Sequence, residues 1–318
     1  MPHQTFAPIA IRTLVASLTA ALLLSVTALS PSQAHDRKDE TPRVAVVSAF
    51  APEMAILRQE LTDASEHSLN GVIFATGTLE GRQVVLFLSG ISIVNAAMTV
   101  QLALDHFRVE RIVFSGIAGG VDPGLNIGDV VIADRWGQYL EMLFAREVDE
   151  GWVTVPIFEY PYANFGMMFP RSVTVVRSDA GEPETRFWFQ TDEEMLAGAR
   201  QAAAHVKLSH CTAEDSCLDE IPRIVVGGSG ISGSAFIDNT AFRAWAFETF
   251  GARVLDMESA AVAHVAYAND VPFIAIRSLA DLAGGGDGAN QMEVFLNLAA
   301  FNATEVVKAL LREMPGKS

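Results

Sequence analysis

Short apolar runs alternate along the chain with longer segments in which apolar residues recur every three or four positions. The runs at 44–49, 111–115 and 273–277 have the length and the valine and isoleucine content of buried strands. The segments at 93–107 and 258–267 have the periodicity of helices that pack on a sheet. Strands that alternate with helices form mostly parallel sheets covered on both faces. The alternation therefore predicts an α/β fold, a three-layer α/β/α sandwich with a mixed, mostly parallel sheet.

The chain is long and apolar enough to bury a substantial core, because half of its 318 residues are hydrophobic. Residues 43–314 contain no internal repeat and no linker, so we expect them to form a single domain. Residues 136–220 break the alternation of strands and helices, because aromatic residues and prolines are interspersed there without regular spacing. Such an aromatic-rich insertion predicts long ordered loops over a ligand site.

The N-terminal residues 1–34 have the pattern of a cleavable signal peptide. Arg12 precedes an apolar run at 14–29, and the small residues Ser32 and Ala34 follow at the spacing of a cleavage site. The run is about 16 residues long, shorter than the ~20 residues that span a bilayer as a helix. We therefore expect cleavage after Ala34 and a periplasmic or secreted mature protein with no stable membrane insertion.

The formal net charge of −16 disfavours polyanionic partners. Nucleic acids and anionic membranes are repelled at long range by such a charge, so we expect no nucleic acid among the partners. A small neutral or zwitterionic ligand stays compatible, because a local pocket can differ from the field of the whole molecule. We also expect no cofactor and no metal. The glycine-rich stretch 227–230 lacks the βαβ context of a dinucleotide site, and no metal-ligand spacing occurs.

Both cysteines of the chain, Cys211 and Cys217, lie in the polar stretch 210–220. In an oxidising compartment they could close a small loop, and we favour this local structural disulfide. Two free thiols are the alternative, while a metal site with His210 would offer too few ligands. Neither cysteine has a predicted catalytic role.

Three carboxylates that are far apart in the chain are placed to meet at one site. Glu53 follows the first strand, Glu258 opens a nearly uncharged helix, and Asp281 comes shortly after the strand at 273–277. Ligands of open α/β sheets bind beyond the carboxyl ends of the strands. The glycine-rich segment 116–120 should lie at the same edge, so we expect all of these residues to converge there.

The segment 254–281, with the sequence VLDMESAAVAHVAYANDVPFIAIRSLAD, resembles the signature region of the nucleoside phosphorylase and nucleosidase superfamily. It is most similar to methylthioadenosine/S-adenosylhomocysteine nucleosidases. Four further matches occur in the family's order: RVAVVSAFAPEMAIL at 43–57, SGI at 89–91, GIAGGVDPGLNIGDVVIAD at 116–134 and SAFIDN at 234–239. The resemblance covers residues 43–135 and 222–313, most of the mature chain, and it implies a single α/β domain.

The resemblance implies a purine nucleosidase, which hydrolyses the N-glycosidic bond of an adenosine-type nucleoside to free base and sugar. Glu53 matches the acid that activates the attacking water, and Asp281 matches the aspartate that protonates the purine at N7. A purine leaves poorly as an anion, so such a proton donor contributes roughly 10²–10⁴-fold to the rate. The two acids have opposite tasks, since Asp281 must hold a proton in an apolar pocket while Glu53 must be ionised.

The remaining matched positions are substrate-binding residues in the resemblance. Glu258 matches the glutamate that binds the ribose hydroxyls, where a carboxylate also stabilises the oxocarbenium-like transition state. Met257 packs beneath the sugar and Phe236 stacks on the purine. The others implied are Ile237, whose backbone reads the purine edge, Ile91 in the SGI match, Gly119 on the sugar side and Arg277 near the attacking water.

Hydrolysis has two competitors within the same superfamily. Its phosphorylases hold phosphate with arginines, one of them just before the glycine-rich turn, where this chain has Phe114. Glu53 would also repel a phosphate dianion, so water is the predicted nucleophile. A purine nucleoside phosphorylase is one alternative, and a non-catalytic nucleoside-binding or storage protein on the same fold is the other. The resemblance also implies a homodimer or a larger homo-oligomer.

Overall fold

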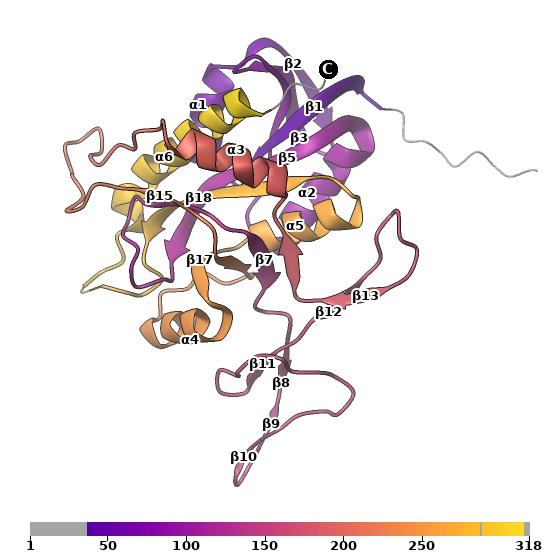
Figure 1. Cartoon of the computed structure of the whole chain (residues 1–318), viewed down its shortest axis with the longest axis vertical. Helices are drawn as coiled ribbons and strands as arrows, with labels where there is room; N and C mark the ends of the chain where they lie inside the picture. Colours follow the sequence, from indigo (N-terminus) through magenta and orange to yellow (C-terminus); the bar gives the residue numbers. More distant parts are fainter. Residues whose placement is uncertain (1–36, 287, 315–318) are drawn as a thin grey trace, which may run out of the picture. The chain divides into compact units, whose positions relative to one another are not determined.

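A mixed sheet of twelve strands runs through the part of the chain that the structure describes, and helices cover both of its faces (Figure 1). The computed structural model describes residues 37–286 and 288–314. The described residues from Arg37 onward pack as one compact unit. The predicted signal peptide at 1–34 lies outside the described residues.

The centre of the sheet is parallel. β1 (Asp39–Ser48) lies between β4 (Arg82–Leu88) and β5 (Phe107–Gly120), and β18 (Phe273–Asp281) lies on the other side of β5. Strands that are covered on both faces have continuous apolar sequences instead of alternating apolar and polar residues. Every residue of β18 is buried in this way. The apolar runs of the sequence are therefore the central strands of the fold.

The flanks of the sheet make it mixed. β2 (Thr62–Leu69) and β3 (Val72–Leu79) continue it beyond β4 as an antiparallel meander. Beyond β5, β17 (Ala252–Asp256) is antiparallel to β5 and parallel to β16 (Ser229–Ser232). The remaining members are β7 (Arg135–Gln138), β14 (Trp188–Gln190), β6 (Val130–Ile132) and β15 (Ile224–Val226). The predicted α/β fold with a mixed sheet is confirmed.

Two helices cover one face of the sheet and three cover the other. α2 (Ile93–His106) and α5 (Ser259–Ala268) share one apolar core with the sheet. α1 (Ala51–Gln59), α3 (Glu193–Ala203) and α6 (Met292–Glu313) share the second core, on the opposite face. α6 is long and apolar enough to cross a membrane, but two thirds of its apolar window is buried inside the protein. Its apolar residues are thus accounted for by the core.

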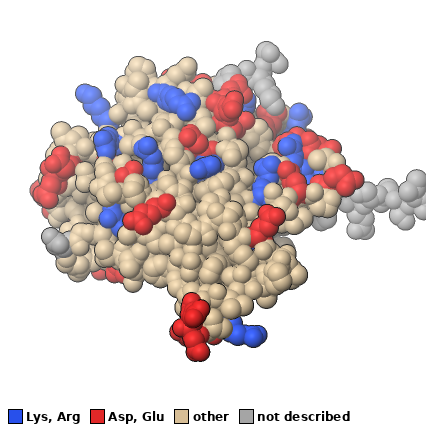
Figure 2. Space-filling model, turned by 60° about the horizontal axis from the view of Figure 1, so that its bottom comes forward, with Lys and Arg blue, Asp and Glu red and all other residues tan. Residues whose placement is uncertain are grey.

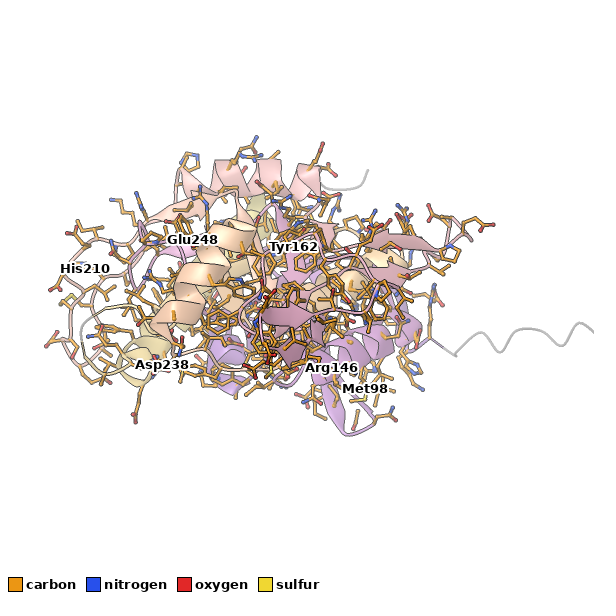
Figure 3. The ribbon with its side chains drawn as sticks, turned by 90° about the horizontal axis from the view of Figure 1, so that it is seen from below. Met98, Arg146, Tyr162, His210, Asp238 and Glu248 are labelled. Carbon is orange, nitrogen blue, oxygen red and sulfur yellow. A yellow bond between two sulfur atoms is a disulfide. The ribbon has the colours of Figure 1, made fainter. Side chains whose placement is uncertain are left out.

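The aromatic-rich segment 136–220 forms an arm and a third apolar cluster. The arm holds three short antiparallel pairs, and its β9–β10 ribbon extends away from the sheet in Figure 1. Tyr162, labelled in Figure 3, lies 4.5 Å from Phe187 and 5.1 Å from Phe250 between ring centroids. Phe250 belongs to α4 (Thr240–Phe250). The pairs are β8 (Met142–Phe144) with β11 (Met168–Pro170), β9 (Arg146–Val148) with β10 (Gly151–Val153), and β12 (Val173–Val175) with β13 (Glu184–Arg186).

Some local expectations hold and others need correction. The predicted disulfide between Cys211 and Cys217 is present, with an S–S distance of 2.08 Å. The glycine-rich segment 116–120 is not a turn after the strand, because its backbone pairs with β18 and continues β5. β18 likewise continues to Asp281. The strand β2 and the helix α3 are among the elements that were not predicted, and so is β16, which lies in the glycine-rich stretch 227–233.

Candidate active site

One cavity of about 270 Å³ opens at the carboxyl ends of the central strands. Its wall comes from the end of β1 and the start of α1, from β5, from the β17–α5 junction and from the end of β18. All of the predicted site residues except Arg277 line it: Glu53, Ile91, Gly119, Phe236, Ile237, Met257, Glu258 and Asp281. The fold therefore brings the three carboxylates to a single cavity, as the strand-end argument predicts.

Glu53 lies in the first turn of α1 and is held by backbone donors. Its Oε2 accepts hydrogen bonds from the N–H groups of Ala49 (2.7 Å) and Phe50 (3.2 Å). Its Oε1 accepts from Ile117 N (2.9 Å) on β5. Burial raises the pKa of Glu53, while Arg277 and the three N–H groups act in the opposite direction. Each of these donors stabilises the ionised carboxylate of Glu53, which is the form that can act as a base.

Glu258 stands at the junction of β17 and α5. Its Oε1 accepts a hydrogen bond from Ser92 N (2.8 Å), at the start of α2. Burial is the main reason that the pKa of Glu258 rises to about 7, and the nearby charges of Asp256 and Glu53 raise it further. Arg277 opposes this rise. Near neutral pH the Glu258 carboxyl therefore exists in both protonation states.

Asp281 is the last residue of β18, and its environment differs from those of Glu53 and Glu258. Its Oδ1 accepts a hydrogen bond from Ala283 N (2.6 Å), and its side chain is almost fully buried. Burial raises the pKa of Asp281 to about 6, and the negative charge of Asp238 contributes to the rise. Asp281 therefore keeps its proton to a much higher pH than an ordinary aspartate.

Arg277 does not line the cavity and is completely buried behind its wall. Its guanidinium lies 4.1 Å from the centroid of the Phe114 ring. Nη1 is 4.0 Å from Glu53 Oε1, and Nη2 is 3.6 Å from Glu258 Oε2. The surrounding carboxylates hold the guanidinium inside the sheet, so Arg277, which the resemblance places near the attacking water, contacts the acids and is not part of the cavity wall.

Two glycines of β5 leave room for the carboxylates. A Cβ on Gly116 would overlap Arg277 Nη1 and lie 2.5 Å from Glu53 Oε1. A Cβ on Gly119 would lie 3.1 Å from Asp281 Oδ1. The separations at Gly116 are far below ordinary van der Waals contact and the one at Gly119 is tight, so glycine at these positions lets the acids approach the strand.

A profile of the Phosphorylase superfamily matches residues 43–312, which is nearly all of the described chain. The chain belongs to the phosphorylase superfamily.

Its relatives in the phosphorylase superfamily match it over almost their whole length. A 5′-methylthioadenosine/S-adenosylhomocysteine nucleosidase of Bacillus cytotoxicus is 32% identical over 277 residues, 86% of this chain and 99% of the relative. A crystal structure of such a nucleosidase from Colwellia psychrerythraea, in complex with adenine, has a TM-score of 0.66 and 27% identity. That alignment covers 87% of this chain and 97% of the other. The S. pneumoniae nucleosidase, with 24% identity, a TM-score of 0.64 and coverage of 86% and 100%, shares the fold.

Within this superfamily fold, sequence reasoning missed part of the cavity wall. Phe50 and Leu255 line the cavity, and so do Met292 and Leu296 of α6. No signal in the sequence shows that the first turns of α6 reach the site. Asp256 also lines the cavity, but it was not predicted as a site residue, because an aspartate just before a helix is usually interpreted as a helix cap.

The aromatic arm is not part of this wall. No residue of 136–220 lines the cavity, so the expectation that these loops cover the ligand site is wrong for this chain. Several of their rings pack instead in the cluster with α4, among them Tyr162, Phe165 and Phe187. Among the described residues, one group could hold a metal by spacing, His210 with Cys211 and Cys217, and both of its sulfurs are in the disulfide.

Proposed function

We propose that the protein hydrolyses the N-glycosidic bond of an adenosine-type nucleoside, related to methylthioadenosine or S-adenosylhomocysteine, to free base and sugar. The observation that carries the proposal is the convergence of Glu53, Glu258 and Asp281 on one cavity whose described wall holds no lysine or arginine. The relatives that match nearly the whole chain bear the name of this nucleosidase activity.

The departure of the base requires a proton, and Asp281 is placed to give it. The pKa of its carboxyl is raised to about 6, and one of its oxygens accepts a hydrogen bond from Ala283 N. The side chain of Asn290 also donates a hydrogen bond to the Asp281 carboxyl. The oxygen that does not accept from Ala283 N would carry the proton to N7 of the purine. Protonation converts the leaving group from an anion into a neutral base, which is the step that a general acid accelerates. Phe236 and Ile237 line the cavity and would contact the purine.

On the sugar side of the cavity, the reaction requires negative charge near the ribose and a base that takes a proton from the attacking water. Glu258 is oriented by Ser92 N and would accept hydrogen bonds from the ribose hydroxyls, while Met257 packs against the ring. Glu53 is fixed by three backbone donors and would take the proton of the attacking water. Both carboxylates favour the positive charge that develops on the sugar in the transition state.

Water is favoured over phosphate as the nucleophile. Phosphate binding in proteins uses arginine, lysine or a helix N-terminus as a source of positive charge. The guanidinium of Arg277 is fully buried and directed at carboxylates, and Phe114 lies beneath it. A phosphate dianion would meet the carboxylates of Glu53 and Glu258, and the described cavity wall has no lysine or arginine to offset their repulsion.

The test is release of free base by purified mature protein in phosphate-free buffer. Methylthioadenosine, S-adenosylhomocysteine, adenosine and inosine are the substrates, and Asp281→Asn is the matched variant because it keeps the size of the side chain. We expect base release by the wild type and a roughly 10²–10⁴-fold lower kcat in Asp281→Asn. Release that depends on added phosphate would favour the phosphorylase, and binding without release would favour the storage protein.

We also propose export of the protein. The support is the apolar leader at 14–29 together with the disulfide, which is typical of oxidising compartments. N-terminal sequencing of protein from the periplasm or medium should begin at His35. A protein that retains Met1 in the cytoplasm would contradict export.

A homo-oligomer is our proposal for the assembled state. Its support is three exposed apolar residues at helical spacing, Ile91 at the cavity and Val94 and Met98 on α2. Met98 is labelled in Figure 3. Charged side chains are also sparse over the centre of the face in Figure 2. Light scattering with size-exclusion chromatography should give at least twice the mass of the mature chain, and Val94→Lys should lower it. A monomeric wild type would contradict the proposal.

A further inference from the structure

Asp256 ends β17 and makes more polar contacts than any of the acids assigned above. Its Oδ1 accepts hydrogen bonds from Glu258 N (3.2 Å), Ser259 N (3.1 Å) and the hydroxyl of Ser232. Its Oδ2 lies 2.7 Å from Arg277 Nε and accepts the hydroxyl of Ser259. The side chain is almost fully buried. Asp256 thus joins the first turn of α5 to the arginine behind the cavity.

Arg277 is the single guanidinium among three buried carboxylates. Asp256 Oδ2 lies on its Nε side together with the hydroxyl of Ser259, which accepts a hydrogen bond from Nε (2.9 Å). Its two terminal nitrogens face Glu53 and Glu258, and Nη1 also donates to Ile117 O (3.4 Å). Nη2 has no hydrogen-bond partner, although it is buried and 3.6 Å from Glu258 Oε2. If the charge of Asp256 were lost, the remaining attraction between opposite charges would pull the guanidinium and those two acids together. Both acids would then leave the positions from which they face the cavity.

We propose that Asp256 is a positioning residue, which keeps Glu53 and Glu258 directed into the cavity by fixing the guanidinium of Arg277 and the backbone of Glu258. This inference rests on the proposed hydrolysis, because the two acids it positions are the ones that act on water and ribose. The purine side of the cavity, with Phe236 and Asp281, makes no contact with this network that the structure records.

The charge of Asp256 also bears on the titration of Glu258. The charged groups that face Glu258 are Arg277 on β18, Asp256 on β17 and Glu53 on α1. Removing the negative charge of Asp256 lowers the pKa of Glu258 from about 7, since one of the carboxylates that disfavour its ionisation is gone. The variant therefore has more ionised Glu258 than the wild type below pH 7, and the same amount at pH 8.

The central variant is Asp256→Asn, which keeps the size and one acceptor oxygen but loses the charge. We expect kcat for methylthioadenosine to fall about a hundredfold at pH 8, the loss associated with a displacement of reacting groups by about 1 Å. The loss should be smaller at pH 5.5. The affinity for adenine, measured by calorimetry, should stay at the wild-type value. Ser232→Ala removes one hydroxyl hydrogen bond to Asp256 and one from Ala260 N but keeps the ion pair with Arg277, so it should lose much less activity.

A double-mutant cycle tests whether Asp256 acts through Arg277. In the Arg277→Lys background, Asp256→Asn should add little to the loss already present, because the group that it positions is gone. Additive losses in the cycle, or a wild-type kcat in folded Asp256→Asn, would overturn the proposal. So would a loss of adenine binding that equals the loss of activity. If Asp256→Asn does not fold, Asp256→Glu replaces it in the same cycle with the same criteria.

Failure of the proposed function would be visible separately, as absence of base release by the wild-type protein. The positioning proposal then has its own readout in binding. Asp256→Asn should weaken the binding of methylthioadenosine, which contains the ribose, and leave the binding of adenine unchanged. Equal effects on the two ligands would contradict it.

Discussion

Glu53 and Asp281 carry the same functional group in two environments. Glu53 receives three backbone N–H groups and faces a guanidinium, whereas Asp281 receives one N–H group and feels the negative charge of Asp238. Both are buried, so the difference comes from donors and charges and not from exposure. Pairs of acids whose surroundings differ in this way are suited to act as base and acid in one reaction.

The pH dependence of hydrolysis should reveal the proton on Asp281. Above about pH 7 both Glu258 and Asp281 are largely ionised, and each further pH unit lowers the protonated fraction of Asp281 tenfold. We therefore expect kcat/KM to fall about tenfold per pH unit on the alkaline side. The residual activity of Asp281→Asn should lack this fall. The same alkaline limb in the variant would assign it to another group.

At the scale of elements, the site depends on how closely β5 approaches α1 and β18. β5 pairs with β18 through the glycine-rich segment, and Glu53 and Arg277 lie directly against Gly116. The strand is therefore both part of the core and part of the floor of the site. A side chain on it would displace catalytic groups and core contacts together.

Gly116→Ala should reduce both activity and stability. Its methyl group would meet Arg277 and Glu53, and overpacking of this kind costs about 1–3 kcal/mol. We expect that loss in urea unfolding and at least a tenfold lower kcat at a temperature where the variant is folded. Gly124→Ala is the control, because its nearest neighbour is the flexible side chain of Asp122 at 3.3 Å. Equal behaviour of the two variants would contradict the role of Gly116.

At the scale of the whole molecule, the buried acids of the site make the free energy of unfolding depend on pH. The folded-state pKa values of Glu258 (about 7) and Asp281 (about 6) lie above their ordinary values of 4.5 and 3.8. The folded protein therefore binds protons that the unfolded chain has released. The resulting stabilisation is complete below about pH 4, and it is lost as the pH rises through about 6 to 7.

The free energy of unfolding of the ligand-free protein should consequently fall between pH 5 and pH 8. At pH 8, Glu258→Gln and Asp281→Asn should each be more stable than the wild type, by on the order of 1–3 kcal/mol. Arg277 keeps Asp256 and Glu53 as partners in Glu258→Gln, so the variant creates no unpaired cation. Denaturant unfolding at several pH values measures the effect. A stability that rises towards pH 8 would contradict it.

Much of the fold could be predicted because local physics decides it. The apolar runs in β1, β5 and β18 are buried on both faces of the sheet, and a short run of that composition is typical of a central strand. The helices α2 and α5 carry their apolar periodicity in the sequence. β2 was missed because it is stabilised by pairing with a neighbouring strand and carries a weak local pattern. α3 was missed although its buried residues recur at helical spacing after the N-cap Asp192, because the aromatic residues and prolines of 136–220 obscured it.

The sequence by itself determined the α/β architecture and the set of residues, Glu53, Glu258 and Asp281 among them, that stand at strand ends. Only the tertiary structure decided that they share one cavity, that Arg277 lies behind its wall, and that the aromatic arm packs on α4 instead of the site. The physical reason is the range of the forces involved. Burial and periodicity act on neighbours in the chain, whereas the pKa of a carboxyl and the direction of a guanidinium depend on charges and donors brought from distant segments.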